Sequence, residues 1–405
     1  MKREWRADPD LPAVQGSTMP FEYEAFVPDE IATVDPVLAA SVGRVINEAD
    51  EAVRELNREV PGIIGLEALS RQLLRQESVA SSRIEGLVMS HRRLAKAAIA
   101  DEDRHRDTSA ESILANIDAM DHAIGVTAAL KKIDVVDLLE VHRVLMEKTR
   151  DAHIAGVIRS SQNWIGGNNY NPGGAVFVPP PEGEVSRLLK DLARFMNRRD
   201  LSPTLQAAVT HAQFETIHPF ADGNGRTGRC FVHVVYRRAE IAPRFVPPIS
   251  LVLATDGDAY VRGLTEYREG RQENWYRDFS LTVIKACRAA RMLGGRIEGL
   301  QKQWMQDAGM PRAGSAARRV IEGLPVQPVF RAAELVKTTG ASKSAMHEAI
   351  TALQRAGVIK QVTVGKRNRA WEAIGLLNLL DEFERDVATP DDSKGKPVRP
   401  VPFLN

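Results

Sequence analysis

The spacing of apolar residues along most of the chain predicts amphipathic helices. Between residues 35 and 61, apolar side chains recur every three to four positions, and Pro61 ends the pattern. A second stretch of this kind runs from about Ile64 to Val79, and Gly86 is placed to end that helix. The same period predicts further helices at 109–130, 134–149, 184–197, 203–217, 225–240, 256–269 and 273–300.

Two segments lack this period. Residues 1–30 contain four prolines, spaced so that no helix is expected to run through them, and we predict an irregular segment. Residues 164–181, WIGGNNYNPGGAVFVPPP, combine paired glycines, an Asn-rich turn and a short β-prone run, which predicts a hairpin or a mobile flap. The expected fold class is therefore mainly α, with a small β-hairpin flap.

A second unit is predicted over residues 311–375. Two short helices separated by a strand, a turn, a helix capped by Ser342 and a hairpin follow one another there, which is the order of a winged helix-turn-helix. Residues 311–371 hold 11 basic and three acidic residues, whereas the whole chain carries a net charge of only +1. Residues 376–405 are expected to form a loose tail.

Composition favours a globular protein and argues against other classes. Of the 405 residues, 43% are apolar and 26% are charged, as in ordinary globular proteins. This length is enough for about two to three domains. Two cysteines, Cys230 and Cys287, are too few for a disulfide framework or a Cys-rich zinc site. No apolar run reaches the ~18 residues of a membrane span, and no secretory signal is visible at the start. We therefore expect a cytoplasmic protein without a membrane partner.

The stretch HPFADGNGRTGR, residues 218–229, carries the most chemical information. Gly223 and Gly225 bracket an asparagine directly before a helical pattern, so backbone N–H groups can approach an anion at the start of a helix. Arg226 and Arg229 are three residues apart and can face the same anion. The stretch therefore predicts a phosphate-binding loop.

Two further side chains of the stretch suit chemistry on that phosphate. Asp222 is a hard oxygen ligand, suited to the Mg²⁺ that accompanies nucleotide phosphates. His218, at the end of the preceding helical pattern, can take up a proton near neutral pH. A base, a metal ligand and an anion cradle together predict phosphoryl or nucleotidyl transfer.

This stretch resembles the signature of the Fic family, H-x-F-x-(D/E)-G-N-G-R-x-x-R, and matches it at every specified position. The flanking GVIRSSQNWIGG and AVFVPP are also similar to that family, and the resemblance extends over about residues 20–300. It implies a helical catalytic core at 109–300, preceded by an N-terminal extension and helical region at 1–108.

Fic proteins usually transfer AMP from ATP to a Ser, Thr or Tyr hydroxyl of a protein. The resemblance implies His218 as the base and Asp222 as the Mg²⁺ ligand. Tyr260 lies in a region where the family often places a residue near the nucleotide base. The implied nucleotide-binding residues of the loop and the following helix are Gly223, Asn224, Gly225, Arg226, Gly228 and Arg229.

The upstream SSRIEG resembles a second element of the family, the inhibitory (S/T)-x-x-x-E-(G/N), through Ser81, Glu85 and Gly86. A carboxylate paired with Arg229 would occupy the place and the charge that the γ-phosphate needs. We therefore expect an enzyme held inactive by Glu85 at rest, with self-modification among the reactions that its release permits.

Two other functions remain open. The same site could remove AMP from a modified protein, with Glu85 positioning the water. Alternatively, the basic residues 311–371 could bind DNA in a transcriptional regulator. Protein docking or a homodimer contact is the favoured role of that module, because helix-turn-helix folds serve many purposes.

Overall fold

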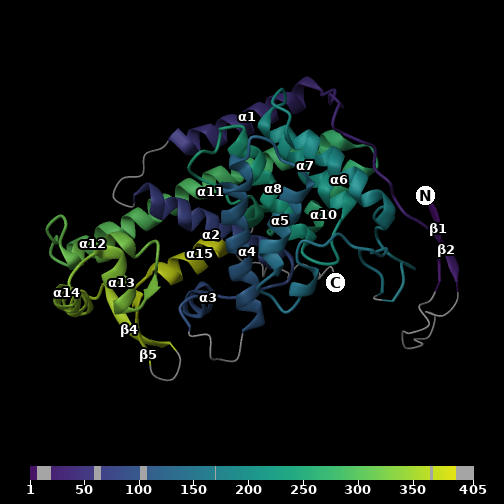
Figure 1. Cartoon of the computed structure of the whole chain (residues 1–405). Coiled ribbons are helices and arrows are strands. Elements are labelled where there is room, and N and C mark those ends of the chain that lie inside the picture. Colours follow the sequence, from purple (N-terminus) through teal and green to yellow (C-terminus); the bar gives the residue numbers. More distant parts are fainter. Residues whose placement is uncertain (7–19, 59–64, 101–106, 169, 365–367, 389–405) are drawn as a thin grey trace.

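The computed structural model describes residues 1–6, 20–58, 65–100, 107–168, 170–364 and 368–388, and it is mainly helical (Figure 1). Each long helix that the apolar spacing predicts is present. These helices are α1 (Ala40–Arg58), α2 (Leu66–Ile84), α4 (Thr108–Gly125), α5 (Val135–Met146), α6 (Glu182–Met196), α7 (Pro203–Ile217), α8 (Asn224–Arg238), α10 (Gly257–Arg268) and α11 (Gln272–Asp307).

Helices α7 and α8 pack against each other at the centre of the molecule. Almost every residue of α7 is buried, because small and apolar side chains surround its whole circumference. Helix α8 is buried nearly as completely, with Phe231 and Tyr236 among the largest enclosed side chains. The loop that joins the two helices is consequently held at both ends by the core.

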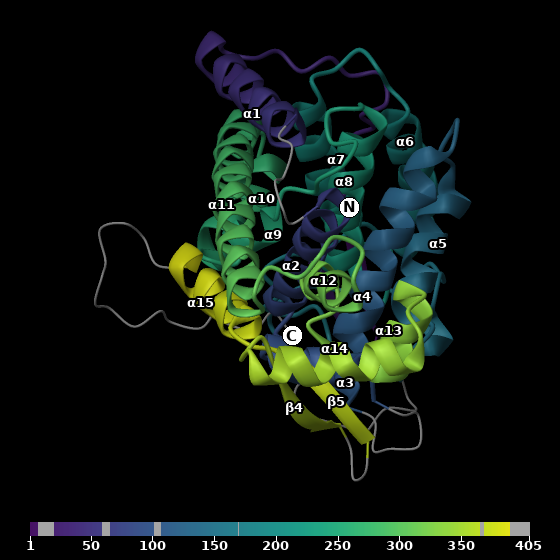
Figure 2. The ribbon, with the colours of Figure 1, turned by 90° about the vertical axis from the view of Figure 1, so that its left-hand side faces the viewer.

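Helix α2 crosses this centre and contacts α4, α8 and α9 (Ile249–Leu253), as Figure 2 shows. Buried Glu77 anchors it there, accepting hydrogen bonds from the backbone N–H and hydroxyl of Ser250 at 2.7 and 2.6 Å. The carboxyl end of α2, which carries Ser81 and Glu85, thereby reaches the start of α8. Helices α1 and α11 lie side by side along another face.

The N-terminal segment corrects the expectation of irregular structure. Strands β1 (Lys2–Trp5) and β2 (Phe21–Glu24) pair antiparallel, with Lys2 opposite Glu24 and Trp5 opposite Phe21. Strand β1 precedes the first proline and β2 lies between Pro20 and Pro28, and the alternation of half-buried and exposed positions in both is the period of a strand. In the flap at 164–181, the described residues form one β-bridge, between Ile165 and Phe177, instead of a hairpin ladder.

The C-terminal module has the predicted order of elements. Gly340, with φ of 65°, ends one helix, and Ser342 caps the next by accepting a hydrogen bond from the Ala345 N–H at 3.2 Å. Its three strands pair antiparallel in the order β3-β5-β4. The elements are α12 (Ala316–Gly323), β3 (Val329–Phe330), α13 (Ala332–Thr339), α14 (Lys343–Arg355), β4 (Ile359–Val364) and β5 (Asn368–Ala373).

The expectation of a loose tail is wrong for residues 376–388, which form helix α15. Leu376, Leu380 and Phe383 recur at helical spacing and are buried against α11 and its neighbours. The rest of that tail lies outside the described residues. Two short helices, α3 (His91–Ala97) and α9, also escaped prediction, because fewer than eight residues give almost no periodic signal. Within the described ranges, no helix has the length and apolar character needed to cross a membrane.

Candidate active site

The site is built on the turn between α7 and α8. His218 ends α7 in the left-handed conformation, with φ of 48°, and its N–H still bonds the Phe214 carbonyl at 2.9 Å. Such a backbone costs on the order of 1 kcal/mol for a residue with a side chain, so neighbouring contacts must hold it. Arg159 and Asn163 do so, donating to the His218 carbonyl oxygen from Nε at 2.9 Å and from Nδ2 at 3.3 Å.

Asn224 and His142 of α5 hold the rest of the turn. Asn224 closes it by accepting from the Phe220 N–H and donating to the Phe220 carbonyl, both at 2.9 Å. The buried Phe220 ring stacks on His142 with 3.6 Å between ring centroids. Burial lowers the pKa of His142 to about 4, so its Nδ1 accepts from Gly156 N–H and its Nε2 donates to the Asp222 carbonyl, both at 3.0 Å. These contacts hold the turn on both sides.

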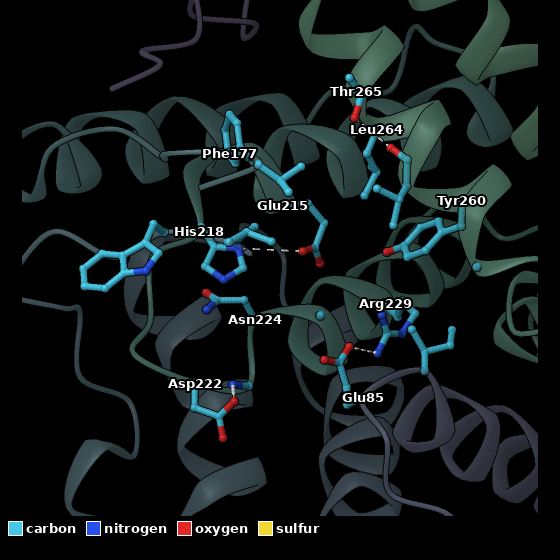
Figure 3. Close-up of a pocket in the computed structure, with 18 of the residues that line it drawn as sticks. Glu85, Phe177, Glu215, His218, Asp222, Asn224, Arg229, Tyr260, Leu264 and Thr265 are labelled. Carbon is cyan, nitrogen blue, oxygen red and sulfur yellow. Dashed lines mark hydrogen bonds and ion pairs between the residues drawn. The ribbon is translucent and has the colours of Figure 1, made fainter. Parts of the chain in front are cut away.

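A cavity of about 240 Å³ opens above this turn (Figure 3). That volume lies just below the ~300–1,000 Å³ of ordinary ligand sites, and the Glu85 side chain takes part of the room. The predicted site residues that line it are Glu85, His218, Asp222, Gly223, Asn224, Gly225, Arg229 and Tyr260.

His218 presents a neutral imidazole to this cavity. Burial, reinforced by the positive charge of Arg159, lowers the pKa of His218 to about 4. Its Nδ1 lies 3.9 Å from Oε2 of Glu215, one turn earlier on α7, and Nε2 is on the opposite edge of the ring (Figure 3). A neutral ring can accept a proton at physiological pH.

The first turn of α8 supplies the predicted anion cradle. Gly223 precedes the helix with φ of 78°, and the backbone N–H groups of the first helical residues have no partner within the helix. Asn224 and Gly225 carry two of these groups and line the cavity. A helix N-terminus with free N–H groups attracts phosphate oxygens.

The carboxylate of Glu85 lies over this cradle and pairs with Arg229 (Figure 3). Nη2 of Arg229 donates to Glu85 Oε1 at 2.7 Å. Burial alone would lower the pKa of Arg229, yet the neighbouring carboxylates raise it above its usual value, so the guanidinium stays charged. The same carboxylate lies so close to Gly225 that it would collide with a Cβ added there. Glu85 thus covers both the arginine and the helix start.

Two predicted phosphate-binding residues do not line the cavity. Arg226 is buried, with Nη2 3.6 Å from Oδ2 of Asp222 at the rim of the cavity. Gly228 faces α7, where an added Cβ would lie 2.6 Å from Glu215 Oε1 and 2.8 Å from Cδ1 of Phe214. Gly228 therefore serves close helix packing.

Two charged residues that line the cavity, Glu215 and Arg268, were missed from the sequence. Glu215 is buried, and burial raises its pKa to about 7. Arg268 of α10 lies over the Phe177 ring of the flap, with its Cζ 3.8 Å from the centroid. Glu215 could have been identified from its spacing, because a residue three positions before His218 lies on the same face of the helix. No feature of the nearby sequence identifies Arg268.

Tyr260 and Asp222 both line the cavity. The Tyr260 hydroxyl is 2.8 Å from Nε2 of His211, and its ring lines the side of the cavity formed by α10. Asp222 stands at the rim, with 63% of its side chain exposed and Oδ1 accepting from the Gly223 N–H at 2.6 Å. One exposed carboxylate next to a phosphate cradle fits Mg²⁺, which is usually held by one or two carboxylates together with phosphates and water.

Comparison with known proteins gives consistent similarities. The Fic/DOC family model matches residues 132–236, and the Fic/DOC family N-terminal model matches residues 44–125. The protein adenylyltransferase Fic of Drosophila erecta is 30% identical over 176 residues, which are 38% of this chain and 34% of that protein. Its Drosophila grimshawi counterpart is 27% identical over 235 residues, 52% of this chain and 47% of that protein. The chain thus matches about a third to a half of the length of these relatives.

Solved structures share the fold. A Fic family protein from Desulfovibrio desulfuricans G20 aligns with a TM-score of 0.51 at 18% identity, covering 84% of this chain and 98% of that one. Fic-1 from C. elegans aligns with a TM-score of 0.51 at 20% identity, covering 62% of this chain and 72% of that one.

Proposed function

This chain belongs to the Fic/DOC family through residues 44–236, and we propose that it is a protein adenylyltransferase, transferring AMP from ATP to a hydroxyl side chain of a protein. One observation carries the proposal. An imidazole kept neutral by burial and the open N-terminus of α8 face the same cavity, six residues apart in sequence. A base and a phosphate cradle at this separation suit attack by a hydroxyl on a bound phosphate.

ATP, the target hydroxyl and His218 account for every bond and proton of the transfer. The hydroxyl oxygen of the target bonds to the α-phosphorus, and the bond from that phosphorus to the oxygen bridging to the β-phosphate breaks. Pyrophosphate leaves, and Nε2 of His218 takes the hydroxyl proton. The Gly223 N–H already donates to Asp222, so the N–H groups of Asn224 and Gly225 would hold the α-phosphate, and Arg229 the γ-phosphate. Mg²⁺ held by Asp222 would neutralise charge on the phosphates.

Glu85 would hold the enzyme inactive at rest. Its Oε1 already accepts a hydrogen bond from Nη2 of Arg229 at 2.7 Å. A γ-phosphate cannot bind Arg229 at the same position without displacing this carboxylate. ATP that binds beside Glu85 would then lie in a pose unsuited to in-line attack, so little AMP is transferred.

The test is mass spectrometry of a cell lysate supplied with ATP and the Glu85→Gly variant. We expect the added mass of AMP on Ser, Thr or Tyr residues, including residues of the enzyme itself. The control is Glu85→Gly combined with His218→Ala, which should transfer ~10²–10⁴-fold less AMP while binding ATP almost as well. Added mass of another nucleotide would overturn ATP as donor, and full transfer by the double variant would overturn the base.

We propose that the role of the C-terminal module is to contact protein and not to bind DNA. Arg331, the residue before α13, donates to the Ile99 carbonyl at 2.5 Å, and Arg92 of α3 donates to Glu372 of β5 at 3.1 Å. These contacts join the module to the helices around Glu85. This structural role accounts for the module without DNA binding. A fluorescence titration with random-sequence duplex at physiological salt should show only weak, strongly salt-dependent binding.

A further inference from the structure

The short segment that carries Glu85 is fixed by its own backbone at one end. Helix α2 ends with Gly86 in the left-handed conformation, φ of 80°. The Gly86 N–H bonds the Arg83 carbonyl and the Leu87 N–H bonds the Ser82 carbonyl, both at 3.0 Å. This pattern of two closing bonds is a common helix ending. It sets the direction in which residues 85–90 leave α2 before α3 begins at His91.

One carboxylate from the far end of the chain holds both sides of this segment. Glu384 of α15 pairs with Nη2 of Arg83, two residues before Glu85. Its other oxygen, Oε1, lies 2.9 Å from Nε2 of His91, the first residue of α3. Only 5% of the Glu384 side chain and 1% of the His91 side chain are exposed.

The Glu384 carboxylate is held in its charged form. Burial would raise its pKa, but His91 and Arg83 outweigh burial and lower it below the usual value. A buried carboxylate paired with Arg83 is a fixed geometric link, because removing that arginine leaves a buried charge without its cation.

Neighbouring contacts hold α15 and its module against α3. Oδ1 of Asp381 accepts from the His91 N–H at 3.2 Å. Arg92 donates from Nη2 to Asn378 Oδ1 at 2.9 Å, and from Nε to Glu372 of β5. Helix α15 thus contacts both the end of α2 and the start of α3, β5 of the C-terminal module contacts α3 as well, and Glu85 lies between these two points.

We propose that Glu384 is a positioning residue for Glu85: by binding Arg83 and His91 together, it keeps the Glu85 carboxylate on Arg229. This inference rests on the proposed adenylyltransferase function and names its regulation. Loss of the Glu384 contacts removes the side-chain link between Arg83 and His91, which flank residues 85–90, and the Glu85 carboxylate then leaves Arg229 more often. Any ligand of the C-terminal module that moves α15 would raise AMP transfer by the same route.

The first test compares Glu384→Ala with the parent chain in AMP transfer to a fixed protein target identified with Glu85→Gly. We expect about a tenfold higher rate, which corresponds to 1.4 kcal/mol in the equilibrium that releases Glu85. In the Glu85→Gly background the same substitution should change the rate less than twofold, because no inhibitory carboxylate is left to position. An unchanged rate in the parent background, or an equal change in both backgrounds, overturns the proposal.

A matched control comes from the same helix. Asp386 of α15 pairs with Arg296 of α11 at 2.7 Å and does not reach α2 or α3. Asp386→Ala should leave AMP transfer at the parent level, so a rise equal to that of Glu384→Ala would overturn a specific role for Glu384. If Glu384→Ala does not fold, Glu384→Gln keeps the volume, removes the charge and is held to the same criterion.

A second readout does not depend on activity. Hydrogen exchange of the Gly86 and Leu87 amides should speed up in Glu384→Ala, while exchange in α7 and α8 stays unchanged. If Glu85→Gly transfers no AMP, the proposed function fails, and exchange alone then decides whether Glu384 fixes this segment. Unchanged exchange at these two amides overturns the proposal whatever the enzyme does.

Discussion

Arg229 donates two hydrogen bonds to Ser81, one from Nε to the side-chain Oγ at 2.8 Å and one from Nη2 to the backbone carbonyl at 2.9 Å. The same Nη2 donates to Glu85, one turn further along α2. Residues four apart share one face of a helix, so the hydroxyl and the carboxylate meet one guanidinium. The spacing of the inhibitory motif therefore has a geometric cause in this chain.

Ser81→Ala should lower the free energy of unfolding by about 1–3 kcal/mol, because the buried Nε of Arg229 loses its acceptor. Urea unfolding followed by circular dichroism measures this. Ser78→Ala, one turn earlier on α2, is the matched control: its hydroxyl donates to the Leu74 carbonyl at 3.0 Å, so its loss leaves no charged group unpaired. Equal losses in the two variants would show that the Arg229 contact is not what matters.

The pH dependence of transfer follows from the burial of His218. Its pKa of about 4 means that the ring is neutral, and able to accept a proton, at any pH above about 5. AMP transfer by Glu85→Gly at saturating Mg-ATP should therefore stay nearly constant from pH 8 to 6 and fall only below pH 5. Glu215, with a pKa of about 7, also changes protonation between pH 8 and 6. The pH profile of AMP transfer is therefore measured a second time with Glu215→Gln added to Glu85→Gly. A midpoint near 6.5 in both would contradict a buried base.

The long helices and the turn at residues 218–229 could be predicted because their signals are local. The apolar period of α1 and α8 reports their buried faces, and the glycine and asparagine spacing reports the turn between α7 and α8. The contact between Arg83 and Glu384 joins residues 301 positions apart, and no local pattern encodes such a pair. Helical spacing likewise predicts the face of α8 on which Arg226 lies, but it does not predict which groups that face contacts.

Glu215 should make stability fall as pH rises towards neutrality. Its pKa is about 7 in the folded chain against 4.5 without burial, so between these values the folded state holds a proton that the unfolded state has lost. The free energy of unfolding then falls with rising pH across that window, by up to ~3 kcal/mol at 1.36 kcal/mol for each pKa unit. Glu215→Gln removes this contribution.

The measurement is urea unfolding of the parent and of Glu215→Gln at pH 5 and at pH 8. The variant should gain stability relative to the parent between the two values. Glu140→Gln is the control, because Arg143 holds the pKa of Glu140 below its usual value and the carboxylate is ionised throughout this range. Its difference from the parent should not change with pH. A pH-independent difference for Glu215→Gln would mean that the carboxyl is ionised in the folded chain.

Gly228→Ala tests whether this glycine serves packing and not phosphate binding. An added Cβ would lie 2.6 Å from Glu215 Oε1 and 2.8 Å from the enclosed Phe214 ring, distances at which a neighbour must move. Overpacking costs about 1–3 kcal/mol, and the better helix propensity of alanine returns up to ~1 kcal/mol. Thermal unfolding should therefore show a net loss of stability in Gly228→Ala.

Gly295→Ala on α11 provides the comparison, because nothing lies within 4 Å of an added Cβ at that exposed position. It should gain up to ~1 kcal/mol from helix propensity alone. ATP binding separates the two roles of residue 228: a packing glycine changes stability first, whereas a phosphate-contacting one changes affinity in a chain that is otherwise as stable as the parent. Lost affinity with unchanged stability would return Gly228 to the nucleotide site.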